Sequence, residues 1–279
     1  MDDVLKNTAL GQQTTFVDQY DANQLYAIPR AASRDGLGVG AELPFQGEDI
    51  WNAYELSWLD NSGKPQVAMA EVRIPAASPH LVESKSFKLY LNSFANSRFA
   101  DAEAVAAIIA QDISATAGAQ ANVQIRSLSE AAALPLWQGE GQCLDQLPLL
   151  QGVDVAGPVG KQWLQHDAGR EGEVAETLYT HLVRSLCPVT GQPDWATLMV
   201  RYVGQPISAQ HLLQYLVSFR QATGFHEHIV EQAFVDISKV LAPAELLVMA
   251  RFTRRGGLDI NPYRSTGTEK INNQREVRQ

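Results

Sequence analysis

The chain has 279 residues, of which 45% are hydrophobic and 8% aromatic, and its formal net charge is -9. This length suffices for one large domain or two of ordinary size, and the composition excludes a disordered chain. The acidic balance argues against direct nucleic-acid binding, because contacts to phosphates need clustered Lys and Arg.

No apolar run approaches the roughly 20 residues of a membrane-spanning helix. The opening M-D-D-V-L-K-N-T-A-L-G-Q-Q lacks the basic start and apolar stretch of a secretory signal. We therefore expect a cytoplasmic protein without membrane contact. The two cysteines, Cys143 and Cys187, form neither a disulfide framework nor a metal-binding pattern, so no metal site is expected. Cys143 is expected to be a small core residue.

Four segments are predicted along the chain. They are an N-terminal arm, a first module, a linker and a second module, at residues 1–45, 46–137, 138–172 and 173–279. In the first module, a turn at Asn61–Pro65 joins two β-prone runs, and a strand at Val123–Ile125 closes the module. Between them, apolar spacing predicts a helix with one buried face, made of Val105, Ile108, Ile109 and Ile113.

The second module repeats the first. S-G-K-P-Q-V-A-M-A-E-V-R-I, from Ser62, matches T-G-Q-P-D-W-A-T-L-M-V-R-Y, from Thr190, at a spacing of 128. Y-L-N-S-F from Tyr90 recurs as Y-L-V-S-F after 125 residues, and D-I-S from Asp112 recurs after 124. Three matches in the same order indicate a duplicated unit.

The repeat also predicts the elements of the second module. A hairpin turn at Thr190–Pro193 is followed by a helix, and a strand at Leu246–Phe252 closes the unit. The apolar face of that helix is predicted to contain Ile229, Ala233, Phe234, Ile237, Val240 and Leu241. The pattern indicates an α+β fold with antiparallel sheets, helices packed on them, and pseudo-dimeric halves that share a pocket.

Reactive residues are divided between the halves. At the repeat spacing, Cys187 aligns with Leu59, and Asp194 aligns with Gln66. E-S-K from Glu83 aligns with S-A-Q, and F-H-E from Phe225 takes the place of F-A-D. Such a division is what a composite site needs.

Cys187 has two interpretations. A lone cysteine is often a buried packing residue. Alternatively, its thiolate is a nucleophile, and Asp194 returns across the Gly-Gln-Pro turn to the same end of the hairpin, where it can transfer a proton.

Other charged residues have similar alternatives. Glu83 can complement a helix dipole, His226 can lie at a solvated helix end, and Arg254-Arg255 can end a strand. In R-R-G-G-L-D-I-N-P-Y-R, however, arginines and glycines suit a phosphorylated ligand. G-L-G-V-G at Gly36 is not a dinucleotide fingerprint, because Glu42-Leu43-Pro44 follows instead of a helix.

Together, E-S-K-S-F-K-L-Y-L-N-S-F, L-C-P-V-T-G-Q-P-D-W, G-F-H-E and R-R-G-G-L-D-I-N-P-Y-R closely resemble the long, two-module form of the NADPH-dependent 7-cyano-7-deazaguanine reductases of queuosine biosynthesis. The resemblance covers nearly the whole chain. It implies two tandem tunnelling-fold modules, a homodimer, and reduction of a nitrile to a primary amine with two NADPH.

The same resemblance implies residue roles. The Cys187 thiolate would add to the nitrile carbon as a covalent thioimide, and Asp194 would protonate the nitrogen. The substrate-binding residues implied are Leu81, Val82, Glu83, Phe225, His226 and Glu227. The cofactor-binding residues implied are Ser84, Lys85, Arg255 and Gly256.

Two alternatives remain at this stage. One is a hydrolase like GTP cyclohydrolase I on the same fold, although that chemistry needs zinc ligands and no Cys/His cluster is visible in the sequence. The other is a non-enzymatic tRNA- or partner-binding module, which the acidic charge disfavours.

Overall fold

The computed structural model describes residues 16–150 and 156–279, and these fall into two units. Unit 1 contains the described residues up to Gly36, together with Glu48–Pro135 and Arg254–Ile260. Unit 2 contains Leu37–Gly47, Leu136–Thr253 and Asn261–Gln279. The segment Arg254–Ile260 belongs to the second repeat in sequence, but it lies in unit 1, which is built mainly from the first repeat.

Unit 1 is built on an antiparallel sheet. Strand β2 (Gln46–Leu59) pairs with β3 (Pro65–Pro75), and β3 pairs with β5 (Asn122–Arg126). Gly63, in the turn between β2 and β3, has a φ of 90°, a left-handed conformation that favours glycine. The predicted hairpin and closing strand of the first module are confirmed.

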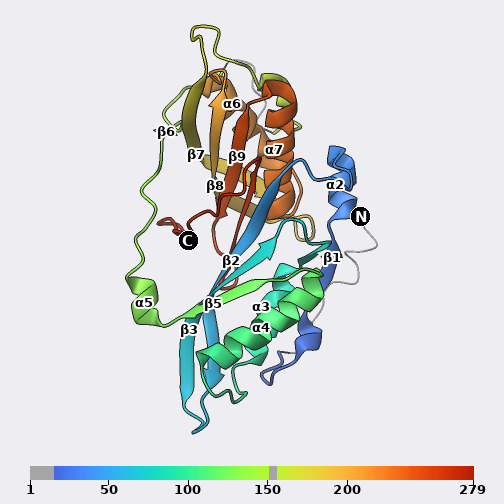
Figure 1. Ribbon diagram of the computed structural model, residues 1–279, viewed down its shortest axis with the longest axis vertical. Coiled ribbons are helices and arrows are strands. Elements are labelled where there is room, and N and C mark those ends of the chain that lie inside the picture. The colour runs from blue at the N-terminus through green and yellow to red at the C-terminus, as the bar shows by residue number, and fades with distance from the viewer. Residues whose placement is uncertain (1–15, 151–155) are drawn as a thin grey trace. The chain divides into compact units, whose positions relative to one another are not determined.

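Two helices cover one face of this sheet, α3 (Ser84–Ser93) and α4 (Ala102–Ala117) (Figure 1). The Asp101 side chain caps α4 by accepting a hydrogen bond from the Ala104 N–H. The predicted apolar face of α4 is confirmed, because its members pack into the core among Trp51, Phe87 and Phe94.

The described part of the arm lies in short elements: η1 (Ala22–Gln24), β1 (Ala27–Pro29) and α2 (Ala31–Leu37). Residues 1–15 of the predicted arm lie outside the described residues. Strand β1 pairs with β4 (His80–Val82), so the arm is anchored next to the start of α3. Helix α5 (Leu128–Ala132) follows β5.

Unit 2 repeats this arrangement with more strands. Its antiparallel strands are β7 (Val174–Leu186), β8 (Pro193–Gly204), β9 (Glu245–Phe252) and the part of β10 (Leu258–Ser265) that begins at Asn261. Its helical elements are η2 (Lys161–Trp163), α6 (Ala209–Val217), η3 (Ser218–Gln221) and α7 (His226–Leu241), and α6 and α7 pack on the strands (Figure 1). The α+β prediction is confirmed.

Two details of the prediction are wrong. Val240 is 43% exposed, because it lies on the outer side of the last turn of α7, whereas the other predicted residues of that face, including Leu241 in the same turn, are buried. Cys143 is exposed rather than in the core, because it lies in β6 (Gln142–Cys143), a two-residue edge strand that pairs parallel to β7. The predicted linker therefore contains β6 and η2, and its residues 151–155 lie outside the described residues.

No helix within residues 16–150 and 156–279 combines the length and the apolar character that crossing a membrane requires.

Candidate active site

Cys187 lies directly after β7, in the turn that leads to β8. Its N–H donates a hydrogen bond to the Gln192 carbonyl at 2.9 Å, and its carbonyl accepts one from the Gly191 N–H at 3.0 Å. Gly191 has a φ of 67°, which a residue with a side chain rarely adopts. The cysteine is half-buried. The interpretation of Cys187 as a buried core residue is therefore wrong, and a tight turn holds it at an accessible position.

Asp194 lies on the opposite strand of the same hairpin. It is paired with Ser185 across β7 and β8, and its side chain is 4% exposed. Ser185 and Asp194 are directly opposite each other on the two strands, and Cys187 follows two residues after Ser185 at the same end of the hairpin. The expectation that the aspartate returns to the cysteine end of the hairpin is confirmed.

His226 adds a third functional group. Its Nε2 lies 3.4 Å from Asp194 Oδ2, and its ring stacks on Phe252 with a centroid distance of 3.9 Å and an interplanar angle of 8°. Its Nδ1 is buried without a hydrogen-bond partner among the described residues. The imidazole is thus fixed in orientation beside the carboxylate.

The first turn of α7 is held beside the cysteine turn by backbone hydrogen bonds. The Leu186 N–H donates to the Ala222 carbonyl at 2.8 Å, and its carbonyl accepts from the Gly224 N–H at 3.1 Å. The next residues are Phe225, at the N-cap of α7, and Glu227, which is 3% exposed in its first turn. Unit 2 therefore brings Cys187, Asp194 and the F-H-E segment together.

Ser185 is a residue of this group that the sequence analysis missed. It is 0% exposed, and its Oγ has no hydrogen-bond partner among the described residues. A buried hydroxyl without a partner costs free energy, which a ligand or a moving side chain can offset by supplying the hydrogen bond. The only sequence signal was its place two residues before Cys187.

The first-module candidates lie in unit 1. Leu81 and Val82 are buried in β4, and Glu83 is 1% exposed at the N-cap of α3. The Glu83 carboxylate accepts hydrogen bonds from the backbone N–H groups of Lys85 and Ser86, at 2.9 and 2.7 Å. Burial raises the pKa of Glu83 above its ordinary value, against these two hydrogen bonds. Helix capping is thus one function of this carboxylate, and its remaining lone pairs can accept hydrogen bonds from a ligand.

Comparison with known proteins identifies the chain. A family model described as nitrile reductase, 7-cyano-7-deazaguanine-reductase N-term, matches residues 16–125, and one described as QueF-like protein matches residues 193–271. The chain is 49% identical over 275 residues to the NADPH-dependent 7-cyano-7-deazaguanine reductase of Burkholderia orbicola (strain MC0-3), covering 98% of this chain and 99% of the relative. The chain belongs to this reductase family. The relative of the same name from Burkholderia mallei (strain SAVP1) has the same identity and coverage.

The two family models fall on the two repeats, so the predicted tandem modules of the reductase family are confirmed. The solved structure of the archaeosine synthase QueF-Like in the apo form aligns with 36% of this chain and 99% of that chain. Its identity of 16% and its TM-score of 0.31 are too low to carry an argument.

The name of this reductase family includes its cofactor, NADPH. All four candidate cofactor-binding residues lie in unit 1. Ser84 and Lys85 begin α3. Arg255 and Leu258 exchange backbone hydrogen bonds of 2.8 and 3.2 Å around a two-residue turn, Gly256–Gly257. The φ values of its two glycines, 61° and 82°, are those that a tight hairpin turn of this kind requires.

This turn packs directly on α3. A Cβ at Gly256 would lie 2.9 Å from Lys88 Cδ, so the lysine side chain would have to move to admit one. Lys88 is one helical turn after Lys85, and Arg254 stacks over the Tyr54 ring at 5.2 Å from its centroid. Lys88 of α3 thus lies against the backbone of the glycine turn that follows Arg254 and Arg255, and the Glu55 carboxylate lies beside Gly257. These residues fit the phosphate groups of a nicotinamide dinucleotide.

Proposed function

We propose that this chain reduces the nitrile of 7-cyano-7-deazaguanine to the primary amine 7-aminomethyl-7-deazaguanine, with NADPH as reductant, in the biosynthesis of queuosine for tRNA. The observation that carries the proposal is the position of the half-buried Cys187 and the buried Asp194 at the same end of the β7–β8 hairpin. The chain's relatives bear the name of this activity. No comparable support favours the cyclohydrolase-like or the non-enzymatic alternative.

Covalent catalysis explains why this activity needs a cysteine and an acid. A nitrile is a poor hydride acceptor, because negative charge on its nitrogen is unstabilised. In our proposal the Cys187 thiolate forms a bond to the nitrile carbon while one C–N π bond breaks. That electron pair moves to the nitrogen, which takes the proton of Asp194, and the product is a thioimide. NADPH, when bound, supplies the hydrides for the four-electron reduction.

His226 and Ser185 act on Asp194 in this proposal. His226, at 3.4 Å, is placed to pair with the carboxylate after the proton has left. Ser185 lies directly across the strand pair, and we assign it as a positioning residue whose hydroxyl donates to the Asp194 carboxylate when substrate is bound. This contact would satisfy the one buried hydroxyl of the group that lacks a partner.

Carboxylates bind the base in this proposal. Glu227 accepts hydrogen bonds from the pyrimidine N–H edge, with His226 beside it and Phe225 closing over the ring. The family resemblance adds Glu83, Leu81 and Val82 as further substrate-binding residues. Buried carboxylates suit this task, since they accept hydrogen bonds only and reject analogues that lack the donors. Ser84, Lys85, Arg255 and Gly256 hold the cofactor.

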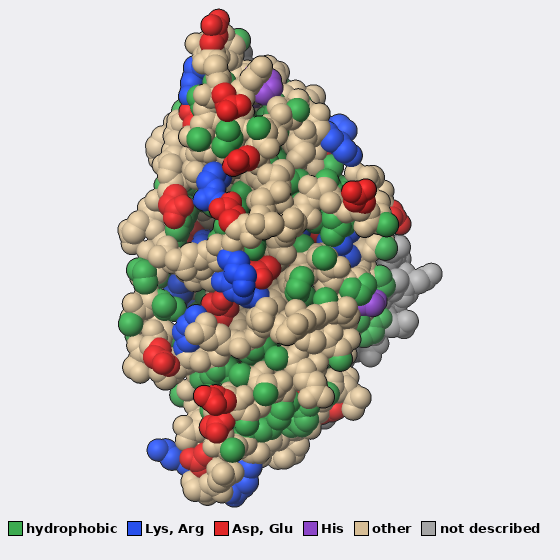
Figure 2. All heavy atoms as spheres, viewed as in Figure 1, with side chains coloured by type: hydrophobic (Ala, Val, Ile, Leu, Met, Phe, Trp, Pro, Cys, Tyr) green, Lys and Arg blue, Asp and Glu red, His purple; other side chains and the backbone are tan. Residues whose placement is uncertain are grey.

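Location and partners follow from the same chemistry. A catalytic free thiol needs a reducing compartment, which supports a cytoplasmic enzyme. On the face drawn in Figure 2, basic and acidic side chains of the described residues are interspersed, which supports a small-molecule substrate rather than nucleic acid.

We also propose a homodimer, as the family resemblance implies, and sedimentation of the purified protein tests it.

The decisive test is the intact mass of the protein mixed with 7-cyano-7-deazaguanine in the absence of NADPH. Wild type is expected to gain the mass of one substrate and to lose it when NADPH is added. Cys187→Ala is expected to show no adduct and no turnover with an unchanged circular dichroism spectrum. Absence of an adduct in reduced wild type, with substrate in excess, would remove Cys187 from the chemistry.

A further inference from the structure

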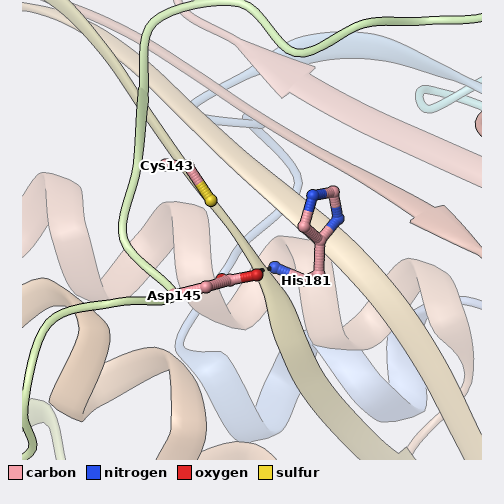
Figure 3. A group of neighbouring side chains, drawn as sticks. All are labelled: Cys143, Asp145 and His181. Atoms are coloured by element: carbon pink, nitrogen blue, oxygen red, sulfur yellow. Dashed lines mark hydrogen bonds between the residues drawn. The ribbon is translucent and has the colours of Figure 1, made fainter.

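Three potential metal ligands meet in unit 2, and none has a part in the proposed reaction. They are Cys143 on β6, Asp145 just after it, and His181 on β7; each offers one ligand atom, and these atoms lie within 4.8 Å of one another. In Figure 3 the Cys143 thiol and the Asp145 carboxylate both point towards the strand that carries His181. Parallel pairing of Cys143 with Tyr179 brings the two segments together.

The Asp145 carboxylate is held in place through one oxygen. Its Oδ1 accepts hydrogen bonds from the Thr180 hydroxyl at 2.6 Å and from the His181 N–H at 3.0 Å. Among the residues that the structure describes, no hydrogen bond reaches Oδ2. One oxygen thus fixes the side chain, as second-shell partners do at metal centres, and the other keeps its lone pairs for a ligand.

A hydrogen-bond network determines which nitrogen of His181 carries the proton. The Thr197 hydroxyl donates to the carboxylate of Glu276, and its oxygen accepts from Arg278 Nη2 at 2.9 Å. Its hydrogen is therefore used, so the contact of 2.7 Å with His181 Nδ1 must be donated by the imidazole. In this tautomer the lone pair is on Nε2, for which no hydrogen bond is found among the described residues.

The network resembles the outer shell of a metal centre. Glu276, 4% exposed, lies 3.5 Å from the same Nδ1, so a buried carboxylate and a hydroxyl orient the imidazole. Arg278, which donates to Thr197, is also paired with Glu276 at 3.0 Å. The His181 ring also makes edge-to-face contacts with the rings of Trp137 and Tyr179, at centroid distances of 6.5 and 5.5 Å.

We propose that Cys143, Asp145 and His181 bind one Zn²⁺ ion through the thiolate, Oδ2 and Nε2, with a water molecule as the fourth ligand. Sulfur, nitrogen and oxygen donors in this combination suit Zn²⁺. Ligand atoms 2.0–2.3 Å from a tetrahedral zinc lie roughly 3.5 Å apart, so the three side chains must close by about 1 Å. The exposed Cys143 has room to rotate. The ion would fasten the predicted linker to β7.

Cobalt substitution tests the site on the full-length protein, independently of the reductase activity. The protein is stripped with a chelator, kept reduced with a phosphine, and titrated with Co²⁺, whose thiolate complexes absorb strongly in the near ultraviolet. Wild type is expected to show this charge-transfer band and to lose it when Zn²⁺ is added. Cys187→Ser, which retains Cys143, is expected to keep the band.

The band is expected to disappear in Cys143→Ser, a nearly isosteric change at an exposed position. Glu276→Gln is expected to weaken Zn²⁺ binding about tenfold through the second shell. A wild type without the band, a band that survives in Cys143→Ser, or a band that is lost in Cys187→Ser would each overturn the proposal. Circular dichroism of the metal-free variants checks that they are folded.

Discussion

The two repeats use the same local devices at equivalent positions. Each has a break in register within its first hairpin, after Ala53 in β2 and after Thr180 in β7. Each first helix contains a tyrosine bonded to an aspartate of the long helix: Tyr90 donates to Asp112 at 2.7 Å, and Tyr215 to Asp236 at 2.9 Å. The residues that repeat in sequence are therefore mainly those that hold helices to each other and strands in register.

The repeats diverge at the turn of the first hairpin. Leu59 pairs with Pro65 in the first repeat, and Leu186 pairs with Pro193 in the second. The second turn is thus one residue longer. By strand pairing the counterpart of Cys187 is Asp60, not Leu59, so the alignment drawn from the sequence alone was wrong by one residue.

The helix ends correct a second alignment. α4 and α7 both contain 16 residues, so Glu227 corresponds to Glu103 rather than to Asp101. Glu103 is exposed, whereas Glu227 is 3% exposed. Asp60 also has a structural task, since hydrogen bonds from Ser62 and Lys64 lower its pKa to about 2. Asp60 thus stabilises the turn of the first repeat, whereas its counterpart Cys187 serves chemistry in our proposal.

The largest expected effect is on turnover, and it distinguishes Asp194 from Gln66, its counterpart in the first repeat. Asp194→Asn removes the proposed acid, and turnover is expected to fall by about 10² to 10⁴. Gln66→Ala, the matched control in unit 1, is expected to leave turnover unchanged. NADPH consumption under substrate saturation measures both. Equal turnover in wild type and Asp194→Asn would remove the acid role.

Ser57 and Ser185 differ in whether the side-chain hydroxyl has a hydrogen-bond partner, and replacing each by alanine tests what that difference means. Ser57 donates to the Gln66 carbonyl at 2.8 Å, whereas Ser185 Oγ has no partner among the described residues. Ser185→Ala is expected to lower kcat by between about tenfold and 100-fold, through misplacement of Asp194, and to shift the pH profile of kcat. Ser57→Ala is expected to cost about 1 kcal/mol of stability without affecting kcat. The reverse pattern would make Ser185 a packing residue.

The tyrosine–aspartate pairs test the shared scaffold. Tyr215→Phe leaves the Asp236 carboxylate without this donor, and a loss of about 1–3 kcal/mol in unfolding free energy is expected. Tyr90→Phe is expected to cost less, because Tyr20 also donates to Asp112, at 2.8 Å. Urea denaturation gives both values. A larger loss for Tyr90→Phe would contradict this account.

The smallest effect concerns the ends of the long helices. Both end in a left-handed residue, Gly118 with a φ of 72° after α4 and Ala242 with a φ of 42° after α7. Ala242→Gly is expected to stabilise the protein by about 1 kcal/mol, because glycine avoids the steric cost of that conformation. Gly118→Ala is expected to destabilise it, since the new Cβ would lie 2.6 Å from Pro79 Cγ. Thermal melting measures both shifts.

Short-range signals in the sequence determined most of the fold. Turn residues and apolar spacing predicted the two hairpins, the two long helices and the placement of Asp194 at the Cys187 end of its hairpin. These features depend on residues close together in the chain, where turn chemistry and periodicity act. The family motifs added the candidate roles.

Only the tertiary structure decided which distant segments meet. Ser84 and Gly256 come from opposite halves of the sequence but belong to the same unit. Cys143 and His181 show no motif, and parallel strand pairing makes them neighbours beside Asp145. The lack of a hydrogen-bond partner for the Ser185 hydroxyl among the described residues likewise depends on how the surrounding segments pack. Long-range pairing depends on the packing of the whole unit, so local sequence patterns do not contain it.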